Sequence, residues 1–256
     1  MFDSGVGGLS VLEAVRRELP DAPILYAADL AGLPYGEKSE AEIAARVSGL
    51  LGRMAERYAP RLICIACNTA STIALGMVRD VLEIPIVGTV PAIKPAAALT
   101  KTGTIGLLGT AATIRQGYVD RLEAEFAADK RLIRHAAPEL VEAAEAKLRG
   151  ETPDPRVFED AIAGLRTASG GADIDTLVLA CTHFPLVADE LATAFSDRVT
   201  MVHGADGIAR RIAHLTSGQP FARPTPDRAV ITGTAAQATA MSPAFARFGI
   251  ASVSPF

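Results

Sequence analysis

Two cysteines, Cys67 and Cys181, stand in closely similar settings. Residues 61–69 read RLICIACNT and residues 175–183 read DTLVLACTH, so each cysteine follows an apolar run and an alanine and precedes small polar residues. A single free cysteine is often just a buried hydrophobic residue, but two in one setting favour a chemical role. Thiols suit proton transfer, because a pKa of about 8.5 leaves both thiol and thiolate accessible around neutral pH.

Two thiols on opposite faces of one carbon atom would racemise an amino acid. One thiolate removes the α-proton, and the opposing thiol returns a proton from the other face. Because the α-proton is only weakly acidic, the site must also orient the substrate and direct fixed dipoles at its α-carboxylate. No lysine motif typical of pyridoxal enzymes is evident, so the sequence implies no cofactor.

Polar residues near the cysteines are candidate helpers. Asp3 precedes a glycine-rich turn and could polarise Cys67, bind the substrate ammonium or cap the following helix. His183 could hold Cys181 as a thiolate by ion pairing, or be a structural histidine. A helix N-terminus also favours a thiolate and binds carboxylates. Three polar residues are expected at helix starts, as carboxylate donors or as ordinary N-caps: Asn68, Thr69 and Thr182.

Short runs rich in Ile, Leu and Val alternate with longer amphipathic segments, which is typical of parallel strands buried on both faces. We expect strands at 23–28, 61–66, 84–88, 104–109, 175–180 and 198–203. We expect helices at 8–18, 39–58, 70–81, 112–127, 138–149, 155–168 and 184–195, the second of which starts at Ser39. The alternation predicts an α/β fold with right-handed crossovers.

A second, weaker pair of similar segments supports two related halves: FDSGVGGLSVLEAV at 2–15 and LLGTAATIRQGYV at 107–119. Breaks occur at 88–97 and 202–207. We therefore expect two similar parallel-sheet α/β domains that face each other across a central cleft. The first comprises 1–90 plus 203–256 and is discontinuous, and the second comprises 91–202. Each offers a cysteine at the carboxyl end of a strand, where open α/β sheets bind ligands.

Composition excludes several classes of protein. The net charge of −4 gives no basic footprint for nucleic acid. No apolar run approaches the roughly 20 residues of a membrane helix, and the N-terminus does not resemble a signal peptide. Three cysteines then suit a reducing cytoplasm rather than a disulfide scaffold. The four histidines are scattered, so no metal site is expected.

Five segments resemble the glutamate racemases of the aspartate/glutamate racemase superfamily, and the resemblance covers nearly the whole chain. They are FDSGVGGLSV at 2–11, LPYGEKS at 33–39, ACNTAS at 66–71, IGLLGT at 105–110 and ACTHFPLV at 180–187. The resemblance implies two α/β domains around a cleft, with no cofactor or metal. It implies interconversion of L- and D-glutamate, which supplies D-glutamate for peptidoglycan. It is compatible with a homodimer, although the sequence does not fix the oligomeric state.

The resemblance also implies roles for particular residues. Cys67 and Cys181 are the two catalytic acid/bases, with Asp3 and His183 as their respective helpers. A further family carboxylate on a helix is best matched by Glu145, with Glu142 as the competing assignment. The substrate contacts that it implies are Asp3, Ser4, Tyr35, Gly36, Asn68, Thr69, Thr182 and His183.

Two departures from the family pattern stand out. Only Met1 and Phe2 precede Asp3, where family members have several apolar residues that form the first strand. Either the natural start lies upstream or this strand is shortened, which would loosen Asp3. The VGTVPAIKPAA stretch at 87–97 also differs from the commoner form, which has a glutamate near its middle.

Three alternatives remain open. A sibling enzyme would racemise aspartate or another acidic substrate, but no clear cationic residue for a shorter distal carboxylate is found. A thiol redox protein would use Cys64 and Cys67 as a C-x-x-C motif, although Cys64 falls inside the predicted strand. A two-lobed binding module would close on an amino acid without turning it over.

Overall fold

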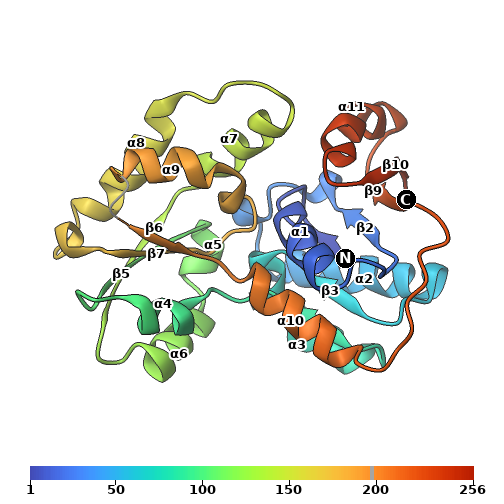
Figure 1. The fold of residues 1–256 in the computed structure, drawn as a ribbon, viewed down its shortest axis with the longest axis horizontal. Coiled ribbons are helices and arrows are strands. Elements are labelled where there is room, and N and C mark those ends of the chain that lie inside the picture. The colour runs from blue at the N-terminus through green and yellow to red at the C-terminus, as the bar shows by residue number, and fades with distance from the viewer. Residues whose placement is uncertain (197–198) are drawn as a thin grey trace. The chain divides into compact units, whose positions relative to one another are not determined.

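The computed structural model describes residues 1–196 and 199–256, which form two compact units (Figure 1). Unit 1 comprises Met1–Thr89 and Ala205–Phe256, and unit 2 comprises Val90–Gly204. Each unit is built around its own parallel sheet. The predicted α/β class is therefore confirmed in both halves of the chain.

The sheet of unit 1 has the strand order β10-β9-β2-β1-β3-β4, and each neighbouring pair is parallel. Its strands are β1 (Phe2–Asp3), β2 (Leu25–Ala28), β3 (Ile63–Ile65), β4 (Ile86–Gly88), β9 (Asp227–Ile231) and β10 (Ile250–Pro255). Because all strands run the same way, their carboxyl ends meet at one edge of the sheet. Asp3, Asp29, Cys67 and Thr232 lie at or just beyond these ends.

The sheet of unit 2 has the order β6-β5-β7-β8, again parallel throughout. Its strands are β5 (Thr104–Gly109), β6 (Arg131–Ala136), β7 (Thr176–Leu179) and β8 (Thr200–Val202). This order repeats β2-β1-β3-β4 of unit 1. In both units, the strand that leads to the cysteine therefore pairs with the first strand of the unit.

Helices connect the strands in both units. Those of unit 1 are α1 (Leu9–Glu18), α2 (Glu40–Tyr58), α3 (Asn68–Val81), α10 (Ala205–Leu215) and α11 (Ala235–Ala246), with 3-10 turns η1 (Leu30–Gly32) and η2 (Tyr35–Glu37). Those of unit 2 are α4 (Ile93–Leu99), α5 (Ala111–Ile114), α6 (Gly117–Phe126), α7 (Glu139–Leu148), α8 (Pro155–Arg166) and α9 (Ala188–Ala194), with η3 (Gly171–Asp173) and η4 (Phe184–Val187). No helix among residues 1–196 and 199–256 is long and apolar enough to span a membrane.

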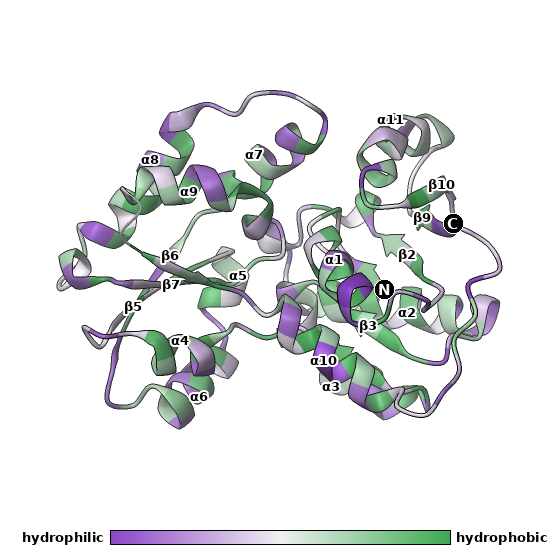
Figure 2. Cartoon of the chain, viewed as in Figure 1, coloured by the Kyte–Doolittle hydropathy of each residue, from purple (hydrophilic) through white to green (hydrophobic). Residues whose placement is uncertain are grey.

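The helices present one apolar face to the sheet of their unit. In α2 the buried residues recur every three or four positions, as Ile43, Val47, Leu50 and Met54 do. Ser39 caps this helix as expected, because its side chain accepts a hydrogen bond from the backbone N–H of Glu42. Figure 2 shows hydrophilic and hydrophobic residues alternating along α8 and α9 in the same way.

Two predicted elements need correction. The single helix expected at 112–127 is wrong, because α5 ends at Ile114 and α6 begins at Gly117. The helix expected at 184–195 starts as the 3-10 turn η4, with Pro185 in its first turn, and becomes α-helical only at Ala188. The strand expected at 198–203 is present as β8, while residue 198 lies outside the described residues.

Candidate active site

Cys67 lies at the junction of β3 and α3 in unit 1 and is only 5% exposed. It is the N-cap of α3, and its Sγ accepts a hydrogen bond from the backbone N–H of Ala70 at 3.4 Å. The sulfur therefore faces the free N–H groups and the positive end of a 14-residue helix. This placement, expected from the sequence, favours a negative charge on the sulfur.

Ser4 links Cys67 to Asp3. The Ser4 hydroxyl donates to Asp3 Oδ1 at 3.2 Å, and its oxygen lies 3.4 Å from Cys67 Sγ. A hydroxyl has one proton, so a Ser4 that donates to Asp3 can only accept from Cys67. The backbone N–H of Gly5 also donates to Asp3 Oδ1, at 2.9 Å. Asp3 is fully buried, so the two-residue strand β1 does not leave it loosely held.

The glycine-rich turn packs tightly against Asp3. A Cβ atom added at Gly8 would lie 2.7 Å from Tyr26 Oη and 2.8 Å from Asp3 Oδ2. These approaches are shorter than van der Waals contact allows, so only glycine fits at this position without displacing its neighbours. The turn therefore sets the position of the Asp3 carboxylate.

Asn68 and Thr69 form the first turn of α3 and are both buried. Asn68 is 5% exposed, and no other group in the described part of the chain donates a hydrogen bond to its Oδ1. A buried amide oxygen without a donor costs free energy. This atom is therefore suited to accept a hydrogen bond from a ligand that carries N–H groups.

Tyr35 and Gly36 lie in the turn η2. They differ in what they offer a ligand, because the Tyr35 hydroxyl is already engaged and the Gly36 backbone is accessible. The Tyr35 ring is buried, and its hydroxyl donates to Asp29 Oδ2 at 2.6 Å. Burial and the hydrogen bond to Asp29 raise the pKa of Tyr35 far above its usual value, so the hydroxyl stays protonated and engaged. Gly36 is only partly buried, so its backbone is accessible for a ligand contact.

Cys181 lies two residues beyond β7 in unit 2, and it is buried beside His183 and Glu145. Its Sγ is 3.8 Å from His183 Nδ1, and His183 Nε2 is 3.0 Å from Glu145 Oε1. Burial alone would lower the pKa of His183, but its hydrogen bonds and charge interactions with Cys181 and Glu145 raise that pKa well above the usual value. These two neighbours therefore favour the protonated form of His183.

The structure distinguishes the two candidate glutamates of α7, Glu145 and Glu142. Glu145 is 8% exposed and contacts His183, whereas Glu142 is exposed. Thr182 is buried beside Cys181, but the segment that follows is the short 3-10 turn η4 and not the start of an α-helix. The expectation that Thr182 sits at the start of an α-helix is therefore wrong. At Cys181, His183 provides the positive neighbour that the N-terminus of α3 provides at Cys67.

Two threonines at the end of β5 were not predicted as site residues. Thr110 and Thr113 are buried, and the Thr110 hydroxyl donates to Thr113 Oγ1 at 3.1 Å. β5 pairs directly with β7, so Thr110 stands at the same sheet edge as Cys181. The internal repeat points to Thr110, because Thr110 follows β5 as Ser4 follows β1.

Cys64 differs from the other two cysteines. It lies inside β3, and burial raises its pKa to about 12. A thiol with so little thiolate at neutral pH is a poor nucleophile, which argues against a redox C-x-x-C site. Within residues 1–196 and 199–256, no group of three or more His, Cys, Asp and Glu side chains could hold a metal ion.

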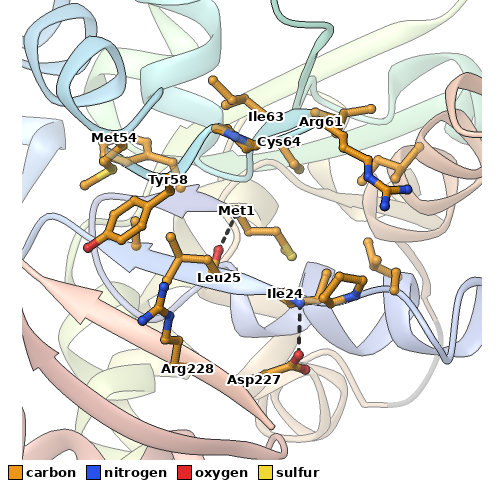
Figure 3. Close-up of a pocket in the computed structure, with 18 of the residues that line it drawn as sticks. Met1, Ile24, Leu25, Met54, Tyr58, Arg61, Ile63, Cys64, Asp227 and Arg228 are labelled. Carbon is orange, nitrogen blue, oxygen red and sulfur yellow. Dashed lines mark hydrogen bonds between the residues drawn. The ribbon is translucent and has the colours of Figure 1, made fainter. Parts of the chain in front are cut away.

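A cavity of about 820 Å³ lies at the opposite edge of the unit 1 sheet (Figure 3). Its walls include Cys64 and the first residues of three strands, Leu25, Ile63 and Asp227. The N-terminal amino group of Met1 donates to Leu25 O within it. None of the candidate site residues lines this cavity, so it is separate from the Cys67 site.

Comparison with known proteins places most of the chain in one family. Residues 9–212 match the Asp/Glu/Hydantoin racemase family. The glutamate racemase of Sphingopyxis alaskensis is 60% identical over 253 residues, which cover 98% of this chain and 94% of that protein. The glutamate racemase of Sodalis glossinidius is 41% identical over 258 residues, covering 98% of this chain and 88% of the relative.

Solved structures give the same result. Escherichia coli glutamate racemase, crystallised with L-glutamate and the activator UDP-MurNAc-Ala, is 38% identical, with a TM-score of 0.93. The match covers 100% of this chain and 96% of that one. A glutamate racemase isoform from Bacillus anthracis is 27% identical, with a TM-score of 0.82 and coverage of 100% and 94%.

Proposed function

The chain belongs to the Asp/Glu/Hydantoin racemase family, and on this basis we propose that it interconverts L- and D-glutamate by proton transfer at the α-carbon. The observation that carries this proposal is the matched pair of buried thiols, each linked to a carboxylate through one polar neighbour. Cys67 is linked to Asp3 through Ser4, and Cys181 to Glu145 through His183. The 60% identity to a glutamate racemase over nearly the whole chain supports glutamate as the substrate.

Each unit supplies one thiol, and the two act on opposite faces of the α-carbon. The thiolate on one face removes the α-proton, and the thiol on the other face delivers its proton to the developing carbanion. After one turnover, the first cysteine carries a proton and the second is a thiolate. The reverse reaction then starts from the second face, and the two forms must interconvert between turnovers.

Different neighbouring groups stabilise the thiolate forms of Cys67 and Cys181. At Cys67, the N–H groups of α3 stabilise the thiolate, and the Ser4 oxygen accepts a hydrogen bond from the thiol form. At Cys181, the positive charge of His183 stabilises the thiolate, and Glu145 keeps His183 protonated. Both cysteines can therefore serve as base or acid near neutral pH.

The substrate is bound through the polar groups around the thiols. The unpartnered Oδ1 of Asn68 accepts a hydrogen bond from the substrate ammonium group. Thr69 and Thr182 offer hydroxyl donors to the carboxylates, and the backbone at Gly36 adds a contact. Fixed donors directed at the α-carboxylate stabilise the negative charge that develops when the α-proton leaves.

D-glutamate made in this way would be supplied for peptidoglycan synthesis, the role that family membership indicates. The activity itself is tested by incubating the reduced protein with L-glutamate in deuterated water, with no added cofactor. We expect D-glutamate to form and deuterium to enter at the α-carbon of the product. If a folded sample gives neither product nor exchange with glutamate, or acts on aspartate at least as efficiently, the proposal is wrong.

A further inference from the structure

An ion pair between the buried Asp29 and the partly exposed Arg46 lies close to Cys67 and has no role in the proposed proton transfer. Asp29 follows β2, is fully buried, and donates its backbone N–H to Asp3 O at 2.9 Å. Its side chain accepts hydrogen bonds from Arg46 Nη2 at 2.7 Å and from the Tyr35 hydroxyl at 2.6 Å. Arg46 Nε and the Thr232 hydroxyl also donate to the same carboxylate. One side chain thus joins the ends of β2 and β9, helix α2 and turn η2.

The group is packed so closely that its parts cannot move independently. A Cβ atom added at Gly32 would lie 2.4 Å from Arg46 Nε, 2.4 Å from Asp29 Oδ2 and 2.8 Å from Tyr35 Cε1. The ion pair and the tyrosine ring therefore close over the backbone of Gly32. The loop that carries Tyr35 and Gly36 is fixed by these contacts.

This loop is adjacent to the thiol. The Tyr35 ring and Cys67 belong to one cluster of buried residues in unit 1. The charge of Cys67 also contributes to raising the pKa of Tyr35, after burial and Asp29, which requires the two groups to be close. A change at Asp29 or Arg46 should therefore affect the surroundings of Cys67 through one intervening side chain, that of Tyr35.

We propose that Asp29 and Arg46 are positioning residues, which hold the Tyr35 ring near Cys67 and the Gly36 backbone in place for the substrate. This inference rests on the proposed racemase function. A buried ion pair adds little to stability compared with well-packed hydrophobic residues. What this pair provides is geometry, because the donors to Asp29 come from three separate segments: the loop of Tyr35, helix α2 and the end of β9. Small displacements of a substrate-binding group can cost large factors in rate.

The test compares Arg46→Met with Arg16→Met. Arg16 forms an ion pair with Asp227, which is also buried, but this pair lies at the opposite edge of the same sheet. Both substitutions remove a cation from a buried carboxylate, so both should lower the unfolding midpoint, Arg46→Met by more because Asp227 keeps a second cation, Arg223, at 3.1 Å. Only Arg46→Met should raise KM for both glutamate enantiomers, by about tenfold. Arg46→Lys should recover part of this loss, because lysine keeps the charge but not the two-pronged hydrogen bond.

A second readout does not depend on turnover. The alkylation rate of Cys67 by iodoacetamide, resolved from that of Cys64 by tandem mass spectrometry, should rise severalfold in Arg46→Met and stay unchanged in Arg16→Met. If Arg46→Met does not fold, Thr232→Val removes one donor to Asp29 and serves in the same comparison. Equal KM values and equal alkylation rates in the two matched variants would overturn the inference. A wild-type protein that fails to racemise glutamate would instead overturn the proposed function, and the alkylation comparison would still decide the positioning role.

Discussion

Glu145 Oε1 lies 3.0 Å from His183 Nε2, and this contact is buried on the side of His183 away from Cys181. The carboxylate therefore acts on the thiol through the imidazole ring. The protonated form of His183 is stabilised by hydrogen bonds and charge interactions with both Cys181 and Glu145, which is why the pKa of His183 is raised despite burial. The arrangement places a positive charge beside Cys181 without a long helix behind it.

Glu145→Gln should lower the pKa of His183, because it removes one of the two negative neighbours. Because the pKa of His183 is raised, its imidazolium form is fully populated below the usual pKa of about 6.5. This form is lost only as pH rises through the folded-state pKa. In Glu145→Gln, His183 should lose its proton at a lower pH than in wild type. The alkaline limb of the kcat/KM profile should therefore shift toward neutral pH. The measurement is the pH dependence of kcat/KM, with an NMR titration of His183.

Glu142→Gln is the matched control, since Glu142 is on the same helix and is exposed. It should leave both the pH profile and the His183 titration unchanged. Coincident profiles for the two variants would show that Glu145 does not control the charge of His183.

Gly8→Ala should destabilise the protein by about 1–3 kcal/mol, the usual cost of overpacking. The added methyl group would collide with Tyr26 Oη and Asp3 Oδ2, so racemisation should fall as Asp3 is displaced. Urea unfolding and steady-state kinetics measure the two effects.

Gly49→Ala, in α2, provides the comparison because nothing lies within 4 Å of its added Cβ atom. It should stabilise the protein by about 0.5–1 kcal/mol through helix propensity and leave activity intact. An active Gly8→Ala variant of wild-type stability would show that the turn does not fix Asp3.

Asp175→Asn should destabilise unit 2 in a pH-dependent way. Partial burial alone would raise the pKa of Asp175, but hydrogen bonds from the Thr100 hydroxyl, the backbone N–H groups of Lys101 and Thr102, and the Thr176 hydroxyl lower it to about 2. The unfolded pKa is about 3.9. The carboxylate thus contributes stability above that pH and loses it as pH falls toward 2.

The gap in Tm between wild type and Asp175→Asn should therefore be constant above about pH 5 and narrow as pH falls from about 4 to 2. Thermal unfolding followed by circular dichroism across this range measures the gap. Asp173→Asn, at an exposed position nearby, should show little difference from wild type at any pH. A gap for Asp175→Asn that does not narrow in acid would contradict the assigned hydrogen bonds.

The central strands of both sheets could be predicted because they are buried on both faces. Thr104–Gly109 is buried throughout and was predicted with its exact bounds. β6 was missed because this edge strand reads RLIRHA and is mostly half-exposed, which breaks the apolar run. β10 is also an exposed edge strand, so it has no continuous apolar run. Helix α11 was missed because it contains Pro243, which is atypical of a helix interior.

The candidate site was only partly predictable for a similar reason. Cys67, Asn68 and Thr69 follow a strand directly, so the motif itself places them at a sheet edge. Asp29 and Arg46 are separated by a loop and most of two helical turns, and no local pattern pairs them before the chain folds. The choice between Glu145 and Glu142 depends on which of them faces His183, a tertiary contact that the spacing of residues in α7 does not determine.

The central claim is that Cys67 and Cys181 act as bases on opposite faces of one substrate, and 3-chloroglutamate separates the two faces. Removal of its α-proton expels chloride, and the resulting enamine hydrolyses to 2-oxoglutarate and ammonium without a returning proton at the α-carbon from the second cysteine. Cys67→Ser and Cys181→Ser, each shown to be folded, are assayed with analogues of both α-configurations.

We expect each variant to lose racemisation of glutamate by about 10²–10⁴-fold. Each should still release 2-oxoglutarate from one configuration of the analogue, and the accepted configuration should be opposite in the two variants. If either variant racemises glutamate at a rate near that of the wild type, or if both accept the same configuration, the two-cysteine account is contradicted.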